Sequence, residues 1–174
     1  MIDLKPFCGD NDIRYYLNEP FSEGEFTYAT NGHILIRVPR RDDAKEVEAD
    51  SMKNRLPKMF ADNPFLLPVE IPDIPPMVEG DCDCCNGEGT HDYKCGNAPP
   101  YACGECNGTG KQMTELGDTQ WPEIEVGNAA FAPKYLRLIK TLPGIQFSPN
   151  TRDHSAAFKF DGGDGLLMPM RKRS

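Results

Sequence analysis

The sequence lacks the residue patterns that most enzymes use. Only 3 of its 174 residues are histidine, and they lie far apart, at positions 33, 91 and 154. No Ser-His-Asp pattern stands out, and the Gly-x-x-x-x-Gly-Lys-Ser/Thr loop that cradles a nucleotide phosphate does not occur. We therefore predict that the protein is not an enzyme and has no small-molecule substrate.

Basic residues and long apolar runs are also scarce. The chain has 19 Lys and Arg against 27 Asp and Glu, a formal net charge of −8, which argues against a broad basic surface but leaves room for a local basic face. No apolar run is long enough to cross a membrane, so we expect no membrane partner. Met1–Lys5 lacks the apolar segment of a secretory signal, and we expect a cytoplasmic protein.

The chain is comparatively rich in cysteine, with seven residues, four of which lie in two copies of the pattern Cys-x-x-Cys-x-Gly-x-Gly. The copies span Cys82–Gly89 and Cys103–Gly110. Each offers two thiolates at the spacing of one tight turn, and two facing pairs make the closed tetrahedral site typical of structural zinc. We therefore predict one structural Zn²⁺ ion, with four ligands: Cys82, Cys85, Cys103 and Cys106.

Alternatives to this ligand set remain. Two disulfides would use the same four sulfurs, although an odd number of cysteines favours a reducing compartment. Cys84 forms a competing Cys82-x-Cys84 pair, but repeat symmetry favours Cys85 because only Cys85 matches the second copy. His91 is a further candidate for a substitute ligand, but because four matched thiols are available we interpret it as a solvent-facing loop residue.

Two elements outside the cysteine repeats are predicted most clearly. Alternating residues over Glu25–Thr30 and His33–Val38 flank Asn31-Gly32, which predicts a β-hairpin with a two-residue type I′ turn. A helix is predicted to begin at Pro133 and to end at Pro143-Gly144. Its 3.6-residue period puts an apolar stripe on one side and three cations on the other: Lys134, Arg137 and Lys140.

Weaker patterns predict the remaining elements. We expect a helix after Ser51 that Pro57 would interrupt or end. Asp161–Gly165 is interpreted as a five-residue turn in preference to a calcium site, with the last strand beginning at Leu166. Short strands are expected at 13–17, 69–71, 121–126, 145–147 and 156–160. The predicted organisation is a discontinuous α+β domain, residues 1–79 and 112–174, with an inserted zinc-binding hairpin module at residues 80–111.

The cysteine repeats resemble the zinc-binding region of DnaJ-type co-chaperones, in which such units pair around zinc. The resemblance covers only Cys82–Gly110. Those co-chaperones carry four units and two zinc ions, whereas two units are enough for one ion. The chain also lacks the His-Pro-Asp tripeptide of the J domain, so the resemblance does not imply co-chaperone function.

A second resemblance involves segments on both sides of the repeats. Ala29–His33 is similar to the Ala-Thr-Asp-Gly-His turn of the bacterial DNA polymerase sliding clamp (the β subunit). Phe131–Leu136 is similar to that family's Asn-x-x-Tyr-Leu helix start, and Leu167–Arg171 is similar to its Met-Pro-Met-Arg ending. The three segments occur in the order expected for a clamp domain.

This resemblance implies a non-enzymatic, clamp-like α+β domain in DNA replication or repair, with a phage as a candidate source. Its basic helix face, with Lys134, Arg137 and Lys140, would meet duplex DNA, although a solvated helix face explains the same pattern. The family also grips short peptides of polymerases in a pocket. The matching residues are Thr30, Gly32, His33, Met168, Pro169, Met170 and Arg171. The alternative is that the hairpin and the final strand only build the sheet, with Met168 in its core.

The chain departs from the clamp pattern in two respects. A clamp chain has three such domains and this chain has material for one, so a ring would require a homo-oligomer. A clamp domain has two bore-facing helices, and here one is missing or relocated to about Ser51–Phe60. The alternative function is a zinc-stabilised protein–protein interaction module with no role in DNA binding.

Overall fold

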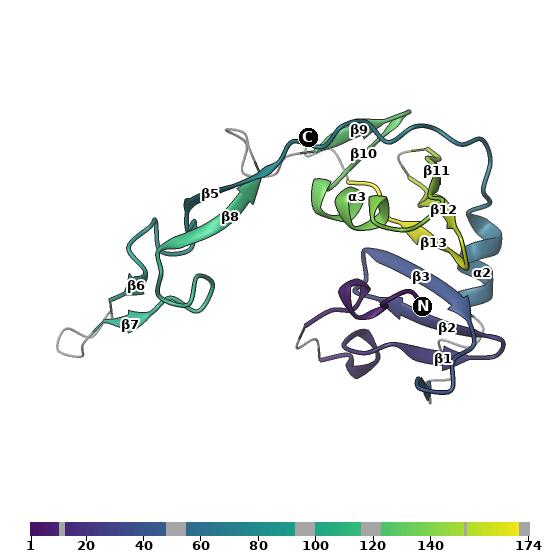
Figure 1. Cartoon of the computed structure of the whole chain (residues 1–174), viewed down its shortest axis with the longest axis horizontal. Coiled ribbons are helices and arrows are strands. Elements are labelled where there is room, and N and C mark those ends of the chain that lie inside the picture. Colours follow the sequence, from purple (N-terminus) through teal and green to yellow (C-terminus); the bar gives the residue numbers. More distant parts are fainter. Residues whose placement is uncertain (11–12, 48–54, 93–99, 116–122, 152, 171–174) are drawn as a thin grey trace. The chain divides into compact units, whose positions relative to one another are not determined.

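The chain divides into two units (Figure 1). A computed structural model describes residues 1–10, 13–47, 55–92, 100–115, 123–151 and 153–170. The first unit comprises Met1–Ile74 and Glu123–Ser174, and the second comprises Pro75–Pro122. The second unit extends beyond residues 80–111 at both ends because it includes the two strands that precede and follow the cysteine repeats.

The first unit is built on a mixed seven-stranded sheet with the order β11-β12-β13-β3-β2-β1-β4. β1 and β4 are parallel, and the other neighbours are antiparallel. The strands are β1 (Phe21–Glu23), β2 (Phe26–Thr30), β3 (Ile34–Pro39), β4 (Lys45–Glu46), β11 (Gln146–Ser148), β12 (Ala156–Phe160) and β13 (Gly163–Leu167). Within the described residues of this unit the other elements are η1 (Lys5–Phe7), η2 (Tyr15–Leu17), α2 (Arg55–Asp62), α3 (Pro133–Lys140) and the hairpin β9 (Ile124–Val126) with β10 (Ala129–Phe131). The fold is therefore of the α+β type, as predicted.

Successive strand residues point to opposite sides of the sheet, so each face presents its own set of side chains. Both faces are covered by other elements of the unit. On one face α3 and β10 pack against the strands, and Figure 1 shows these two elements beside each other. On the other face α2 packs through Leu56 against Tyr28 and Leu35. The two α-helices of the described residues, α2 and α3, therefore lie on opposite faces of the sheet. Each fully buried large side chain contributes about 1.5–3 kcal/mol relative to an exposed one.

The predicted β2–β3 hairpin forms, but its turn is longer than predicted. Thr30 pairs with Leu35, so four residues lie between the last paired residues of the hairpin. Asn31 does not have the positive φ of a type I′ turn. Instead the Asn31 side-chain oxygen accepts hydrogen bonds from the backbone N–H groups of His33 and Ile34. A two-residue turn occurs between β1 and β2, where Gly24 has φ 57°.

The final hairpin, β12–β13, also differs from the prediction. Its turn contains only two residues, since Phe160 already pairs with Gly163. Gly163 and Gly165 lie in the strand, where a Cβ atom would collide with the Phe160 and Phe158 rings, respectively, and with carbonyl oxygens of β3. The absence of a side chain at these two glycines leaves space for the Phe160 and Phe158 rings against the strand. The glycines are strand residues and not turn residues.

Two charged groups in this region pair with each other across the sheet. Asp164, which a calcium site would have used, accepts two hydrogen bonds of 2.7 and 2.8 Å from the Arg37 guanidinium. That guanidinium also lies over the Phe60 ring, 3.7 Å from its centre. Asp164 therefore forms an ion pair that links β13 to β3.

Three further expectations need correction or qualification. Tyr15–Leu17 forms a 3₁₀-helix and not part of a strand. Pro57 does not interrupt its helix, because it is the third residue of α2 as described and the first turn needs no backbone N–H donor. Val69 makes only an isolated bridge to Phe147. The expected N-cap Ser51 and the expected strand start at residues 121–122 lie outside the described residues. The strands expected at 145–147 and 156–160 are confirmed as β11 and β12.

The second unit consists of short paired strands around the cysteine repeats. β5 (Met77–Asp81) pairs antiparallel with β8 (Lys111–Glu115), and β6 (Thr90–His91) pairs with β7 (Tyr101–Ala102). The buried cluster in the described part of this unit consists of four cysteines.

Candidate metal centre and binding pocket

The two cysteine repeats fold into the same turn. In the first, the Gly87 N–H donates to the Cys82 carbonyl at 3.1 Å, and in the second the Gly108 N–H donates to the Cys103 carbonyl at 3.0 Å. The residue after the second cysteine has a positive φ in both turns, 50° at Asn86 and 52° in its counterpart. Asparagine tolerates this left-handed conformation better than most residues with a side chain.

The two turns also hold each other. The Cys82 N–H donates to the Gly110 carbonyl at 2.9 Å, and the Cys103 N–H donates to the Gly89 carbonyl at 2.8 Å. A Cβ atom on Gly110 would collide with the carbonyl oxygen of Gly87, and one on Gly89 would meet the equivalent carbonyl of the other turn. The last glycine of each repeat therefore permits the backbones to approach closely.

This pairing brings four sulfur atoms together. The Sγ atoms of Cys82 and Cys103 are 3.9 Å apart, and those of Cys85 and Cys106 are 3.8 Å apart. A tetrahedral site with metal–sulfur bonds of about 2.3 Å has sulfur–sulfur edges of about 3.8 Å. All four cysteines are buried, and their sulfurs lie within 4.8 Å of one another, so they could hold a metal ion.

Two of the four thiols have pKa values that shift in opposite directions. The backbone amide of Cys106 lowers the pKa of Cys103 to about 6, whereas burial raises the pKa of Cys85 to about 11. The backbone N–H of Gly89 donates to the Cys85 sulfur at 3.1 Å, and Gly110 does the same for Cys106 at 3.2 Å. A bound divalent ion supplies the positive charge that lets all four thiols ionise.

Two other candidate ligands lie next to this cluster. The Cys84 sulfur is 3.5 Å from His91 Nε2, and both atoms lie within 4.8 Å of the Cys103 sulfur. Cys84 is exposed and His91 is half-buried. They form a neighbouring group that shares Cys103 with the four-cysteine cluster. Cys95 lies outside the described residues.

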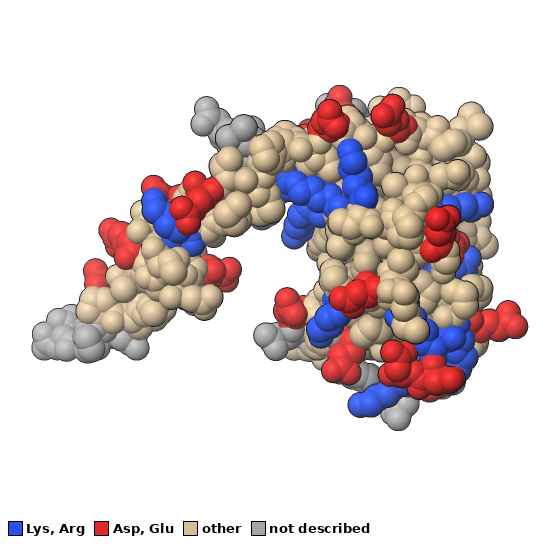
Figure 2. Space-filling view, in the orientation of Figure 1, with Lys and Arg blue, Asp and Glu red and all other residues tan. Residues whose placement is uncertain are grey.

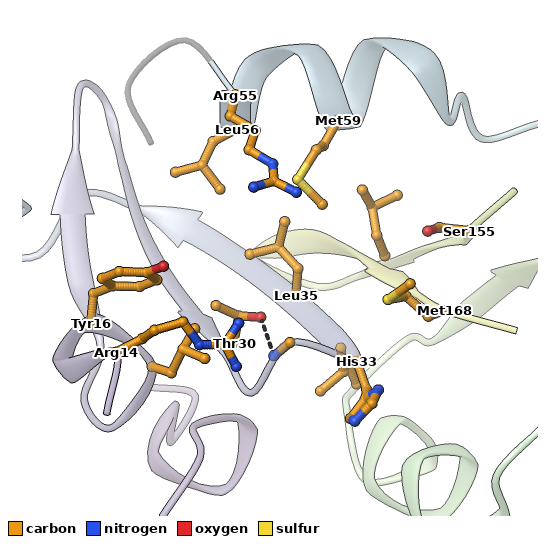
Figure 3. A pocket seen from close by; sticks show the side chains of 14 residues that line it. Arg14, Tyr16, Thr30, His33, Leu35, Arg55, Leu56, Met59, Ser155 and Met168 are labelled. Atoms are coloured by element: carbon orange, nitrogen blue, oxygen red, sulfur yellow. Dashed lines mark hydrogen bonds between the residues drawn. The ribbon is translucent and has the colours of Figure 1, made fainter. Parts of the chain in front are cut away.

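The first unit contains a separate pocket of about 280 Å³ (Figure 3). Its residues come from the segment before β1, the β2–β3 turn, α2 and the adjoining ends of β12 and β13. The turn is fixed on two sides: Asn31 Nδ2 lies 3.3 Å from the Tyr135 hydroxyl, and the Met168 N–H donates to the His33 carbonyl at 2.9 Å.

The pocket combines an apolar lining with basic groups. Figure 3 shows Arg55 reaching down from α2 and Arg14 approaching from the opposite wall, with His33 at one edge. Among the described residues that line the pocket, none is Asp or Glu. The apolar lining residues are Tyr16, Leu17, Ile34, Leu35, Leu56, Met59, Leu166 and Met168. Such a lining suits a ligand with apolar side chains and a carboxylate.

The pocket contains four of the seven residues that the clamp resemblance assigned to peptide binding: Thr30, Gly32, His33 and Met168. Pro169 and Met170 are half-buried and do not line it, and the Met170 N–H donates to the Ala130 carbonyl at 2.7 Å. Arg171 lies outside the described residues. Sequence reasoning missed Arg14 and Arg55, because only the tertiary fold brings them to the β2–β3 turn.

The three cations assigned to DNA lie on α3, where Figure 2 shows a group of basic side chains. Lys134 and Lys140 are exposed and Arg137 is half-buried. The Lys140 Nζ lies 3.3 Å from the Pro72 carbonyl oxygen, and the Lys134 Nζ lies 4.9 Å from the centre of the Tyr135 ring. Lys140 therefore contributes to holding the segment before the second unit as well as to the charge of the helix.

Comparisons of the chain with protein families, with curated protein sequences and with solved structures find no match. In the described parts of the chain, no helix has both the length and the apolar character needed to span a bilayer.

Proposed function

We propose that the chain is a non-enzymatic binding protein whose first unit captures a short peptide segment of a partner protein. The observation that carries this proposal is the pocket beside the β2–β3 turn, where His33 and two arginines surround an apolar lining. A peptide with leucine or phenylalanine side chains and one nearby carboxylate complements this chemistry. The apolar groups supply the affinity, and Arg14 and Arg55 select the acidic residue.

The replication or repair context of this function rests on the sliding-clamp resemblance. In that family the residues matching Thr30, Gly32, His33 and Met168 grip peptides of polymerases, and here these four residues line one pocket. We therefore propose that the partners are replication or repair proteins. The second unit would stabilise the assembly or add a further contact surface.

For the second unit we propose that Cys82, Cys85, Cys103 and Cys106 together hold one structural Zn²⁺ ion. Four thiolates are soft ligands, and the sulfur spacings suit tetrahedral geometry, both of which favour zinc over calcium or magnesium. Four protein ligands leave no coordination position for a substrate. The ion therefore holds the fold and takes no part in a reaction.

The peptide proposal is tested with a fluorescein-labelled nine-residue peptide library in which two leucines are constant and one position is either Asp or Asn. Fluorescence anisotropy should show that Asp-containing peptides bind the wild type more tightly. Arg55→Glu should weaken them about tenfold or more, and Met168→Ala about fivefold, equivalent to about 1 kcal/mol.

Leu67→Ala is the matched control, because Leu67 is an exposed apolar residue of the same unit outside the pocket lining. Equal affinity for the Asp and Asn peptides in the wild type, or equal losses in Met168→Ala and Leu67→Ala, would refute the assignment of the pocket.

DNA binding by α3 is the second candidate function. Lys134, Arg137 and Lys140 all lie on this one helix, and the clamp resemblance assigns that helix to the bore. Since α2 covers the other sheet face, the described part of each chain would supply one such helix, and encircling DNA would require several copies.

The test compares two charge-reversal variants for retention of duplex DNA between 50 and 200 mM salt, concentrations over which phosphate contacts lose affinity steeply. Reversing Lys134, Arg137 and Lys140 to Glu should reduce the slope of log affinity against log salt by about 0.9 per lost phosphate contact. Reversing the exposed Lys45, Lys58 and Lys159 makes the same change in charge elsewhere on the first unit. Equal effects of the two variants would exclude α3 as the DNA site.

A further inference from the structure

The two cysteine repeats are equivalent in backbone but differ at two chemically important positions. Each residue of the first repeat corresponds to the residue 21 positions later in the second, as the shared hydrogen bonds show. By this correspondence Cys84 matches Glu105, and His91 matches Gln112. The first repeat therefore carries two additional metal-ligating side chains that the four-cysteine cluster does not use.

These additional groups lie together at a distance suited to one metal ion. The Cys84 sulfur and His91 Nε2 are 3.5 Å apart, and a tetrahedral ion with metal–sulfur and metal–nitrogen bonds of about 2.3 and 2.1 Å has a sulfur–nitrogen edge of about 3.6 Å. The Cys103 sulfur lies within 4.8 Å of both of these atoms. The His91 ring also lies against the Tyr101 ring, with centres 5.5 Å apart, on the neighbouring strand.

The charge of the second unit favours another cation. Pro75–Pro122 contains eight acidic and two basic residues, a net charge of −6 before any thiol ionises. Figure 2 shows that acidic side chains predominate on the visible face of this unit. A divalent ion with four thiolates adds a further charge of −2. A second divalent ion would therefore enter a strongly negative environment.

We propose that the second unit has a second metal position, formed by Cys84, His91 and Cys103, in which the Cys103 thiolate bridges two ions. This inference rests on the proposed four-thiolate site, which supplies the first ion. The new position takes a thiophilic divalent ion such as Zn²⁺ or Cd²⁺. Its three protein ligands leave one coordination position for water or for a side chain of a partner, so this ion is more exposed and exchanges faster.

The number of zinc ions bound per chain tests both the four-cysteine site and the second metal position. Native mass spectrometry of the full chain, titrated with Zn²⁺ and then desalted, should show two ions per wild-type chain. His91→Gln, which installs the residue that the second repeat has at this position, should bind one, and Cys84→Ser should also bind one. Cys8→Ser is the control and should keep two, because Cys8 lies in the first unit.

The outcomes distinguish the two sites. One ion per wild-type chain, or two ions in both His91→Gln and Cys84→Ser, would overturn the bridged position while leaving the four-cysteine site intact. No bound ion in the wild type would overturn the four-cysteine site itself.

A second measurement guards against misfolded variants. With excess ¹¹³Cd²⁺ the wild type should give two cadmium resonances, and His91→Gln should lose only the one with mixed sulfur and nitrogen ligands. A single resonance in the wild type would contradict the proposal. Retention of the all-sulfur resonance in His91→Gln shows that the variant still folds around the first ion.

Discussion

The two units of the chain are stabilised in different ways. The first unit buries two apolar clusters, one on each face of its seven-stranded sheet. In the described part of the second unit the buried residues are the four cysteines with Gly89 and Gly110, and none is a large aliphatic or aromatic residue. A segment this poor in apolar residues cannot form a core by itself, and a metal ion can take the place of that core.

The units also differ in charge. The second unit has a net charge of −6, whereas the first has 19 acidic and 17 basic residues, a net charge of −2. The net charge of the whole chain therefore says little about the surface of the first unit. A nucleic acid or an acidic peptide that approaches the first unit meets the nearly balanced charge of that unit, not the charge of the whole chain.

The largest expected effect comes from breaking the metal centre. Cys106→Ser should abolish tight metal binding and unfold the second unit, because zinc contributes about 10–16 kcal/mol to small metal-stabilised modules. The first unit should keep its fold. Metal analysis with limited proteolysis measures both results, and Cys8→Ser is the control that should retain metal. If the second unit of metal-free Cys106→Ser resisted proteolysis, metal would not be what stabilises that unit.

The corresponding change in the first unit removes part of its apolar core and leaves the metal centre of the second unit untouched. Phe158 is fully buried, and Phe158→Ala should lower the unfolding free energy of the first unit by about 3–5 kcal/mol. Denaturant unfolding followed by circular dichroism measures this loss, and Leu67→Ala at an exposed site should change it little. Metal content should stay unchanged in both variants. A loss of metal in Phe158→Ala would show that the two units do not fold independently.

A backbone substitution within the second unit should have a smaller effect. Gly110 has φ 71°, and a Cβ atom there would collide with the Gly87 carbonyl, so Gly110→Ala should weaken metal binding about tenfold or more. Gly104→Ala is the matched control, because a Cβ atom at Gly104 meets no atom within 4 Å. Competition with a zinc-chelating dye measures both affinities. Equal affinities would show that close backbone approach is not required.

The smallest effect concerns a thiol of the first unit that does not bind metal. Burial raises the pKa of Cys8 from its usual value of 9.0 to about 11. Because the folded state holds the proton more tightly, this contribution to stability is complete below pH 9 and is lost as pH rises from 9 to 11. The group is only half-buried, so the expected loss is about 1 kcal/mol.

Denaturant unfolding at pH 7.5, 9 and 10.5 checks this prediction. The stability difference between wild type and Cys8→Ala should shrink as pH rises, because only the wild type carries the thiol. A constant difference across this range would show that the Cys8 thiol is not desolvated.

The sequence predicted the elements whose determinants lie close together in the chain. The four facing cysteines, the start of α3 at Pro133 and strand β12 were found because spacing and local periodicity define them. The two faces of β3 were also correct, since a shift of the turn by two residues leaves every side chain on the same side of the sheet.

The predictions that were wrong depend on distant partners or on a competing local interaction. Asn31 caps its turn through its side chain instead of adopting a positive φ, which a dipeptide pattern does not reveal. Gly163 and Gly165 resemble turn residues until the Phe158 and Phe160 rings are seen above them. The arginines of the pocket carried no sequence pattern at all.

The central claim is that a metal ion organises the second unit while an apolar core organises the first. Hydrogen–deuterium exchange of the intact chain, before and after complete removal of metal by a chelator, reads both units in one sample. The account predicts that the amides of Gly89 and Gly110, which donate to the sulfurs of Cys85 and Cys106, lose protection while strands β12 and β13 keep theirs. Undiminished protection at Gly89 and Gly110 in the metal-free chain would contradict it.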